Sequence, residues 1–508
     1  MAELTERPFP PGRYPLMVVG SGPGALQLSY CLKRLGLEHA VISEDPAPGG
    51  MFRRWPIFQR MLSWTKPFAA QERGSRAYER YDWNSLLLAD EEADRAIMPT
   101  VMDGTSYFPS RPEMERGLVA FVERAAVRIR HGCRWESTRI DRGEFVLGTS
   151  DGEYRTSAAV FAVGIAQPWK PRVLAVDGVQ QYGELRAAET YADRRVFIVG
   201  KQNSGFEIAT GLLPWARQIV LASPSPTRLS VDTRSLVGVR ARYVQPYEDW
   251  ALAGGVVILD ASIESVEPAG EVYRVHTASP QDGRSLVFEA DDVIAATGFV
   301  APLQDLPELG VSTFGQSRLP SLTPHWESAT VPGAYFAGTL TQASQGLKKH
   351  GIPSNSGAVQ GYRYNARVLA RHLAEKRFGK RLERPRLRPE DVVGTLLAEV
   401  SHGPEVWHQR SYLARVLTLE GGDGATDEGI QPLAAFVDGD GPDGVAMTLE
   451  SNGRDDPYPA AYVRSKGIVK EHLLPPHPLL DFEGDDYRAE LADRLQALLG
   501  SRLTRSAS

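Results

Sequence analysis

Two stretches of the chain, starting at residues 14 and 194, share one order of features: a short apolar run, a glycine turn and a helical pattern. The first reads YPLMVVGSGPGALQLSYCLKRLG, and the second reads RRVFIVGKQNSGFEIATGLLPWA. Each leads into another apolar run, AVISE or QIVLAS, so each is typical of a β-α-β unit. Two such units predict an α/β fold with two Rossmann-like dinucleotide-binding domains.

The first glycine turn, GSGPGA, has the small residues that a dinucleotide site requires. One glycine permits the tight turn, the next lets the pyrophosphate approach, and the third small residue lets helix and strand pack closely. An acid at the end of the next strand is placed to hold a ribose. The candidate ligands of this unit are Gly20, Gly22, Gly24, Ala25 and Glu44.

The second turn departs from this pattern, because Gln202 stands where the middle glycine is expected. No acid ends the following strand, which instead leads to Ser223, Ser225 and Arg228. Small hydroxyls beside a guanidinium suit a 2′-phosphate, so the sequence favours NADPH over NADH. The alternative is a degenerate domain that binds no nucleotide. The candidate ligands here are Gly200, Asn203, Ser204, Gly205, Ser223 and Arg228.

Further segments point to FAD at the first site. The stretch SEDPAPGGMFRRW, with Gly50, Met51 and Trp55, resembles the GG-x-x-W region of flavin monooxygenases and related two-dinucleotide flavoproteins. The alternative is a surface turn with Trp55 in the core. The segments FAVGIAQP and VIAATGFVAP resemble the paired strands that link the FAD and NADPH domains in that superfamily, which adds Thr297 and Gly298 as candidates.

The stretch GAYFAGTLTQASQGLKKHGIPSNSGAVQGYRYNARVLARHL resembles a narrower family, the FAD oxidoreductase-domain proteins that include nitrosuccinate-forming aspartate N-oxygenases. The resemblance covers about residues 14–380. It implies that Gly338 and Thr339 contact FAD, although Thr339 replaces the usual acid. It also implies that Ser354–Gly357 starts a helix aimed at the flavin, with Ser356 and Gly357 as ligands.

By the same resemblance, Lys348, Lys349 and His350 lie on a loop near the isoalloxazine, so Lys349 and His350 are the catalytic candidates. The alternative is that these basic residues are merely solvated. The implied activity is an FAD- and NADPH-dependent monooxygenase that uses dioxygen, forms a C4a-hydroperoxyflavin, and oxygenates a small molecule at an amine nitrogen. An acidic amine or amino acid is the expected substrate class. Two rivals remain, a non-oxygenating flavin oxidoreductase and a flavin-bound interaction protein.

Absences narrow these choices. Val176 and Tyr182 replace the Phe and His of the F-x-G-x-x-x-H stretch in Baeyer–Villiger and flavin-containing monooxygenases, which disfavours both. The only cysteines, Cys31 and Cys133, form no C-x-x-C, so a redox-active disulfide of the thioredoxin-reductase kind is not expected. We also expect no metal site.

Composition sets the remaining bounds. A net charge of −6 gives no electrostatic reason to expect nucleic acid or an anionic membrane as a partner. No apolar run of about 18 residues is present, and the N-terminal apolar stretch runs directly into the glycine turn. We therefore expect a cytoplasmic enzyme. The oligomeric state stays open.

The order of elements predicts three domains. These are an FAD-binding domain (1–165 and 293–380), an NAD(P)H-binding domain (166–292) and a C-terminal α+β domain (381–508). The last follows the basic, proline-containing linker KRLERPRLRPEDV. Within it, SYLARVLTLE, PLAAFVDG and GVAMTLES are expected to be strands, and a helix is expected near YRAELADRLQALLG.

Overall fold

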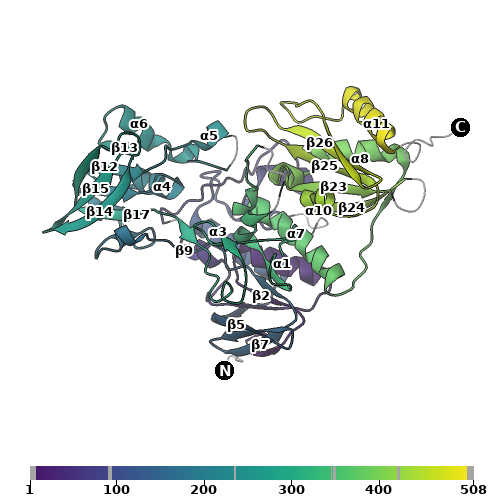
Figure 1. Cartoon of the computed structure of the whole chain (residues 1–508), viewed down its shortest axis with the longest axis horizontal. Coiled ribbons are helices and arrows are strands. Elements are labelled where there is room, and N and C mark those ends of the chain that lie inside the picture. The colour runs from purple at the N-terminus through teal and green to yellow at the C-terminus, as the bar shows by residue number, and fades with distance from the viewer. Residues whose placement is uncertain are drawn as a thin grey trace. The chain divides into compact units, whose positions relative to one another are not determined.

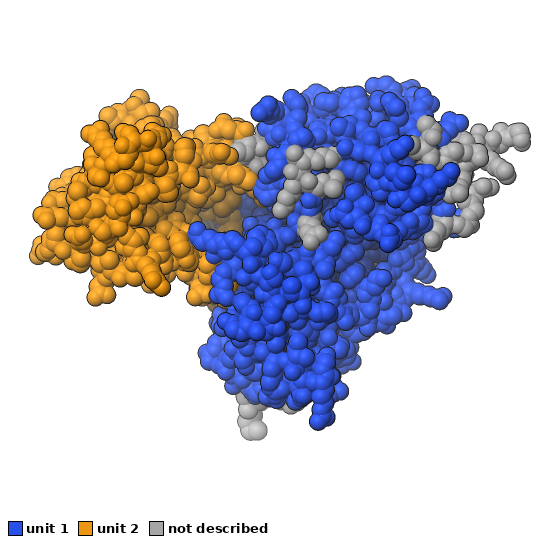
Figure 2. Space-filling model, viewed as in Figure 1, with its two compact units in different colours: residues 1–52, 63–164, 303–508 blue, residues 53–62, 165–302 orange. Residues whose placement is uncertain are grey.

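The computed structural model describes residues 7–55, 57–89, 94–233, 236–344, 346, 350–419 and 424–499. The contacts of the chain divide it into two units (Figure 2). Unit 1 comprises Met1–Phe52, Ser63–Gly164 and Leu303–Ser508, and unit 2 comprises Arg53–Leu62 and Ile165–Pro302. Across the described ranges, no helix is both long and apolar enough to cross a membrane.

Unit 1 contains a five-stranded parallel sheet built around the first β-α-β unit (Figure 1). Its strands, in spatial order, are β21 (Ala334–Phe336), β8 (Ala159–Phe161), β2 (Met17–Val19), β3 (Ala40–Ser43) and β4 (Arg130–His131). The four strands other than β4 are buried along their whole length, which explains their uninterrupted apolar sequences.

Two helices of this unit pack against each other. Helix α1 (Pro23–Arg34) follows β2, and α7 (Val359–Lys376) follows β21 and two short 3-10 helices, η6 (Gly338–Ala343) and η7 (Asn355–Gly357). Helix α3 (Arg111–Ala125), predicted after Pro112, begins with a capping box between Ser110 and Glu113. Smaller helical segments are η1 (Gly50–Arg53), η2 (Arg76–Tyr81) and α2 (Met98–Val101).

Two smaller sheets complete this part of unit 1. The larger runs in the order β1-β7-β6-β5, and the smaller is the hairpin β19-β20. Their bounds are β1 (Gly12–Arg13), β7 (Gly152–Thr156), β6 (Glu144–Thr149), β5 (Trp135–Asp141), β19 (Thr313–Phe314) and β20 (Leu319–Pro320).

Unit 2 contains the second parallel sheet, in the order β10-β17-β11-β12-β13. Alternate residues of β11 enter opposite cores: Val196 and Ile198 face one cluster, and Phe197 and Val199 face the other. The strands are β10 (Gln180–Gln181), β17 (Asp292–Ala295), β11 (Arg195–Val199), β12 (Gln218–Ser223) and β13 (Val256–Asp260). The prediction of an α/β fold with two Rossmann-like domains is therefore confirmed.

The remaining elements of unit 2 flank this sheet. An antiparallel sheet has the order β14-β15-β16, and β9 pairs with β18. Their bounds are β14 (Ser262–Ala269), β15 (Val272–Ala278), β16 (Ser285–Ala290), β9 (Gln167–Pro168) and β18 (Phe299–Val300). The helical segments are α4 (Asn203–Leu212), α5 (Ser230–Thr233), α6 (Gln245–Ala251), η3 (Arg172–Leu174), η4 (Ala188–Tyr191) and η5 (Ala241–Tyr243).

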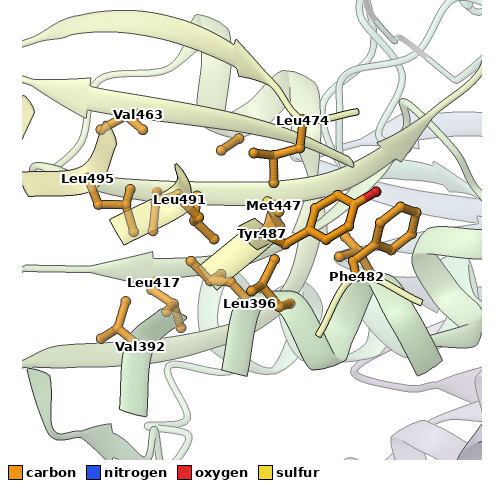
Figure 3. Packing of buried hydrophobic residues seen from close by; sticks show 14 of the residues in the cluster. Val392, Leu396, Leu417, Met447, Val463, Leu474, Phe482, Tyr487, Leu491 and Leu495 are labelled. Atoms are coloured by element: carbon orange, nitrogen blue, oxygen red, sulfur yellow. The ribbon is translucent and has the colours of Figure 1, made fainter. Parts of the chain in front are cut away.

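The C-terminal part of unit 1 is a six-stranded antiparallel sheet with helices on both faces. Its strands, in order, are β22 (Arg386–Leu387), β24 (Ala425–Pro432), β23 (Leu413–Thr418), β25 (Gly444–Glu450), β26 (Tyr458–Ser465) and β27 (Ile468–Leu473). Helices α8 (Pro389–His402) and α11 (Asp485–Leu499) share one apolar core with the sheet, in which Leu396, Leu417, Met447 and Leu491 meet (Figure 3). The domain boundaries drawn from the sequence remain a prediction.

One predicted strand is a helix. The segment PLAAFVDG forms α10 (Leu433–Asp438), which covers the sheet face opposite α8 and α11. Leu433 and Phe436, three residues apart, both lie in this second core, and Ala434 is buried as well. Alanine and leucine favour a helix, and the spacing of three fits a helical face better than a strand. The short length of the apolar run hid this periodicity.

Candidate functional site

The first glycine turn is shaped by two close backbone approaches. Gly20 has a φ of +119°, and a Cβ there would lie 2.6 Å from the carbonyl oxygen of Ala162. A Cβ at Gly24 would collide with the backbone of Gly338, and Ala25 beside it is completely buried. These positions need small residues because the protein itself fills the surrounding space.

Gly22 differs from its neighbours, because a Cβ there would meet no protein atom within 4 Å. Its φ of −72° and ψ of 171° are open to any residue. It is also the N-cap of α1, and no side chain caps the helix at this end. The open space and the uncapped N–H groups therefore fit a dinucleotide pyrophosphate.

The acids after β3 take different positions. Glu44, the predicted ribose ligand, is exposed. The carboxylate of Asp45 lies near the glycine turn and accepts hydrogen bonds from Ser21 Oγ (3.5 Å) and Ser43 Oγ (3.4 Å). The two hydroxyls are themselves 2.8 Å apart. Asp45 is thus a second acid beside this turn, and the sequence reasoning passed over it.

The glycine pair after this acid folds back over the turn. The Gly49 N–H donates to the carbonyl oxygen of Ser21 (3.0 Å), and a Cβ at Gly50 would lie 3.2 Å from Gly22 Cα. Met51 is half-buried. The structure therefore brings Gly50 to the same turn as Gly22, while a contact of Met51 with FAD stays a prediction.

The segment after β21 also reaches this turn. Gly338 packs against Gly24, and a Cβ at Gly164 would lie 3.5 Å from the Thr339 hydroxyl. Ser356 is buried, and Gly357 lies beside the side chain of Gln342. Gly338 and Thr339 therefore join the glycine turns in one neighbourhood of unit 1.

The predicted helix start at Ser354 is not the start of α7. Ser354 precedes the 3-10 helix η7, and the chain is extended at Ala358 (φ −139°, ψ 163°), which is the N-cap of α7. A cluster of buried hydrogen bonds around η7 holds this conformation. The interruption between η7 and α7 is therefore part of the fold. The first turn of α7 therefore begins at Val359, beyond the proposed ligands.

That cluster includes a residue of the C-terminal part. The Gln409 amide donates to Ser356 Oγ (2.8 Å) and Asn365 Oδ1 (2.7 Å), and its oxygen accepts from the Asn355 N–H (3.1 Å). Asn365 in turn donates to Ser356 Oγ and to Thr341 Oγ1, both at 2.9 Å. All the side chains that take part are almost fully buried. The C-terminal part is thereby joined to both η6 and η7.

Three predicted cofactor ligands, Trp55, Thr297 and Gly298, belong to unit 2. Trp55 packs against Tyr182 with ring centroids 5.2 Å apart and contributes to the unit's apolar core. The Thr297 hydroxyl donates to the carbonyl of Trp169, whose N–H donates to the Gly298 carbonyl (2.9 Å). Their roles toward FAD stay predictions.

The second glycine turn is also closely packed. A Cβ at Gly205 would collide with the carbonyl oxygen of Gly200, so both glycines are needed for the turn itself. Gln202 is exposed at the N-cap of α4, where no side chain provides a cap, and Ser204 is half-buried. The N–H groups at the start of α4 therefore fit an anion, as those of α1 do.

Asn203 has a role in the fold. Its side chain donates to the Gly238 carbonyl (3.0 Å) and accepts from the Arg240 N–H (2.9 Å). This pair of bonds fastens the loop after β12 to the start of α4. The exposed Arg228 lies on that loop, and Ser223 is the last residue of β12.

An ion pair at this sheet edge was not foreseen. Lys201, inside the second turn, is 1% exposed and its ammonium pairs with Asp260. Asp260 ends β13 and stands opposite Ser223 in the register of the two strands. Lys201 thus places a cation beside the predicted phosphate ligands.

A buried acid lies on the helix of the same turn. Glu207 in α4 accepts a hydrogen bond from the hydroxyl of Tyr182, and both side chains are buried. Burial raises the pKa of Glu207 to about 7, and the Tyr182 hydroxyl and the charge of Arg242 partly offset this rise. Glu207 can therefore hold a proton near neutral pH.

Only part of the predicted catalytic loop lies within the described residues. Lys348 and Lys349 lie outside the described residues. His350 is exposed, and its Nε2 lies 3.2 Å from the hydroxyl of Tyr458 in the C-terminal part. The catalytic role of Lys349 and His350 stays a prediction.

Sequence reasoning missed Asp45, Lys201, Glu207 and Gln409. Two of these had a local signal: Asp45 adjoins the predicted acid, and Lys201 lies within the second glycine motif. Glu207 follows that motif, but its burial depends on Tyr182, which is distant in sequence. Gln409 had no local signal at all.

A family model described as "Pyridine nucleotide-disulphide oxidoreductase" matches residues 17–338. The chain is also 23% identical over 436 residues to the FAD-dependent oxidoreductase domain-containing protein 2 of Mus musculus. This alignment covers 79% of the chain and 64% of the mouse protein, so the chain spans less than two thirds of that relative. The match agrees with the flavoprotein family that the sequence resembles, while the likeness to aspartate N-oxygenases stays a prediction.

Two solved structures share the fold. A bacillithiol disulfide reductase from Bacillus cereus aligns with a TM-score of 0.54 and 19% identity, covering 72% of this chain and 99% of that chain. An ornithine N-hydroxylase from Kutzneria sp. 744 aligns with a TM-score of 0.53 and 15% identity, with the same coverage of both chains. At these identities the comparison shows the fold alone.

Proposed function

Since the chain belongs to the pyridine nucleotide-disulphide oxidoreductase family, we propose that it is an FAD- and NADPH-dependent monooxygenase that oxygenates a small molecule at an amine nitrogen. One observation carries its flavoprotein character: the open space at Gly22, at the uncapped start of α1. A protein-filled turn would leave no room for a pyrophosphate there. At the coarser level the chain is a flavin-dependent oxidoreductase.

Several residues of unit 1 would hold FAD. The N–H groups at the start of α1 would bind the pyrophosphate, with Gly50 closing over the turn. Asp45 and Glu44 are the two acids available to the ribose. Gly338 packs against Gly24 and Thr339 lies beside Gly164, and this closeness to the glycine turn supports a contact of both residues with FAD.

The residues of unit 2 would hold NADPH. The start of α4 would bind the pyrophosphate, with the side chain of Gln202 at its edge. Arg228 and Ser223 supply a guanidinium and a hydroxyl for the 2′-phosphate, while the nearby Lys201 is neutralised by its ion pair with Asp260. These groups support NADPH over NADH.

The cysteines argue against disulfide chemistry carried by the chain. Cys31 and Cys133 are both free, and burial raises the pKa of each thiol, so neither is poised as a thiolate. When bound, FAD supplies the two-electron chemistry between NADPH and dioxygen that side chains cannot perform. This supports an acceptor other than a disulfide of the protein.

The choice of an amine nitrogen rests on resemblance and on a shared fold. The family that the sequence resembles includes amino-acid N-oxygenases, and an ornithine N-hydroxylase has the same fold. A non-oxygenating reductase is the second candidate, because a disulfide reductase has this fold too.

Coupling between three measured quantities tests this function. The FAD-loaded protein is supplied with NADPH and a panel of amines that includes L-aspartate, L-ornithine and cadaverine. We expect one class of amine to stimulate NADPH oxidation and oxygen uptake together, with an equal amount of N-oxygenated product by mass spectrometry. NADPH oxidation that yields only hydrogen peroxide, or that needs an acceptor other than dioxygen, would favour the reductase.

A further inference from the structure

Arg410 lies two residues beyond the end of the short helix α9 (Pro404–His408), next to Gln409. One aromatic residue, Trp407, holds its side chain in place. Its Nε donates to the carbonyl oxygen of Trp407 (3.0 Å), and its guanidinium carbon lies 4.3 Å from the centroid of the Trp407 ring. Both side chains are half-buried, so solvent reaches this pair. Two contacts therefore fix the guanidinium while its terminal amino groups stay available.

Three other arginines of unit 1 are paired with acids. Arg76 binds both Glu399 and Glu405, Arg367 pairs with Glu405, and Arg415 pairs with Glu399. Over the described ranges of the chain, by contrast, no carboxylate pairs with Arg410. Since an uncompensated, partly buried charge is costly, this cation is suited to an anion that the chain itself does not provide.

A second cation strengthens the positive charge at this point. The guanidinium of Arg80 lies 5.5 Å from the centroid of the same Trp407 ring. Its two terminal amino groups donate to the carbonyls of Val400, Ser401 and Gly403, at the end of α8. Arg80 is thus compensated by a helix C-terminus, and Arg410 is not.

Burial and the neighbouring cation both affect the pKa of Arg410. Burial, and next the charge of Arg80, lower the pKa of Arg410 to about 10. The group remains a cation at neutral pH, and a bound anion would relieve the repulsion.

This cation belongs to a segment that contacts the proposed flavin site. Its neighbour Gln409 binds Ser356 in η7, and the hydroxyl of Tyr412 donates to the carbonyl of Ile352 (3.1 Å). Residues 409–412 therefore lie along 352–356, all within unit 1.

We propose that Arg410, fixed by Trp407 and beside Arg80, binds a carboxylate group of the substrate. The guanidinium fork matches a carboxylate in a bidentate geometry, and the indole wall keeps the fork oriented. This inference rests on the proposed function, because it names the chemical class of its substrate: an amine that also carries a carboxylate. It uses a residue that lies outside the part of the chain matched by the family model.

Calorimetric titration of the full-length, FAD-loaded protein without NADPH tests the site apart from turnover. The probes are succinate, its diethyl ester and inorganic phosphate. We expect succinate to bind and the ester and phosphate to bind much more weakly. Arg410→Gln should raise the Kd of succinate roughly tenfold to a hundredfold, because it removes a charge-assisted bidentate contact. Arg410→Lys, which keeps the charge without the fork, should fall between.

Arg134→Gln is the matched control, since Arg134 is an exposed arginine paired with Glu136. This variant should bind succinate like the wild type. FAD absorbance and the circular dichroism spectrum report whether each variant is folded. If Arg410→Gln loses FAD, the proposal is tested instead by succinate binding to Arg410→Lys and by the comparison of succinate with its ester in the wild type.

Three results overturn the inference: no binding of succinate to the wild type, equal binding of the ester or phosphate, or unchanged binding in a folded Arg410→Gln. These failures leave the proposed function intact if amines still couple NADPH oxidation to product. Conversely, succinate binding that depends on Arg410, in a protein without oxygenase activity, supports the anion site and refutes the proposed function.

Discussion

Gly22 and Gly24 belong to one turn, yet their substitution should have opposite consequences. A Cβ at Gly22 would meet no protein atom within 4 Å, whereas a Cβ at Gly24 would collide with Gly338. Gly22→Leu should therefore keep the melting temperature of the apoprotein but fail to retain FAD, because the leucine occupies the pyrophosphate space. Gly24→Ala should lower the melting temperature itself. The measurements are the ratio of flavin to protein absorbance and thermal unfolding followed by circular dichroism; full FAD occupancy in Gly22→Leu would refute the assignment.

Arg228 tests the second nucleotide site at the same scale. The exposed guanidinium makes no ion pair within the described residues and is placed for the 2′-phosphate that distinguishes NADPH from NADH. Arg228→Gln should raise the KM for NADPH, because the lost phosphate contact contributes about 1.5–3 kcal/mol to the free energy of binding. The KM for NADH should stay nearly unchanged. Initial rates with both cofactors measure this. An equal rise for both would mean that Arg228 does not contact the phosphate.

The buried Glu207 in helix α4 should make the stability of the fold depend on pH. The pKa of Glu207 rises from 4.5 to about 7 on folding, so the folded chain binds a proton that the unfolded chain has released between these pH values. The contribution of Glu207 to the free energy of unfolding therefore falls as pH rises from 4.5 to 7, by on the order of 3 kcal/mol, and is level above that range. Glu207→Gln can still accept the hydrogen bond from the Tyr182 hydroxyl but cannot titrate. Urea unfolding at several pH values should show that the stability of the wild type relative to Glu207→Gln falls as pH rises from 4.5 to 7, and parallel curves would contradict this.

Two 3-10 helices of the flavin site depend on one side chain of the C-terminal part. Gln409→Leu removes three buried hydrogen bonds to Asn355, Ser356 and Asn365 and leaves polar groups unsatisfied. We expect a loss of roughly 1–3 kcal/mol in stability and a weaker hold on FAD, since η7 is no longer fixed. Reconstitution of the apoprotein measures the Kd of FAD. Gln281→Leu, in an exposed turn of unit 2, is the control, and an unchanged FAD affinity in Gln409→Leu would separate the network from the cofactor.

The elements that sequence predicted well are those whose cause is local. Strand, glycine turn and helix follow one another within about twenty residues at both nucleotide motifs, so α1 and α4 could be placed directly. The segment that became α10 failed because a six-residue helix shows too little periodicity. The partners of Gln409 and Arg76 lie far away in the chain, and no local pattern reports such pairs. The nucleotide-binding part of the candidate site could therefore be predicted from the sequence, whereas the contribution of the C-terminal part could not.

At the scale of the whole molecule, the C-terminal sheet meets the nucleotide-binding part of unit 1 through polar groups as well as apolar ones. Arg76 reaches from η2 to the buried Glu399 and Glu405 of the C-terminal helices. Helix α7 also contacts β24. This joint explains why the contacts of the chain place residues 381–508 in unit 1. The stability of the joint should therefore depend on the charges that it encloses.

A histidine pair at the same joint should make it sensitive to acid. The rings of His325 and His372 are stacked with centroids 4.1 Å apart, and Gln431 of β24 bonds to His325. Burial, followed by the neighbouring His325, lowers the pKa of His372 to about 3, from 6.5. At His372 the unfolded chain therefore binds more protons between these values, and the contribution of this residue to stability falls as pH drops below 6.5.

The substitution His372→Phe removes the titratable imidazole while an aromatic ring remains to stack on His325. At pH 8, where both imidazoles are neutral, the variant should unfold in urea within about 1 kcal/mol of the wild type, as a shape-conserving swap does. At pH 5 the wild type should have lost stability relative to the variant, because the variant lacks one of the two groups that must stay neutral in the folded chain. A difference between the two proteins that is the same at pH 8 and pH 5 would show that the stacked pair does not control the acid response of the joint.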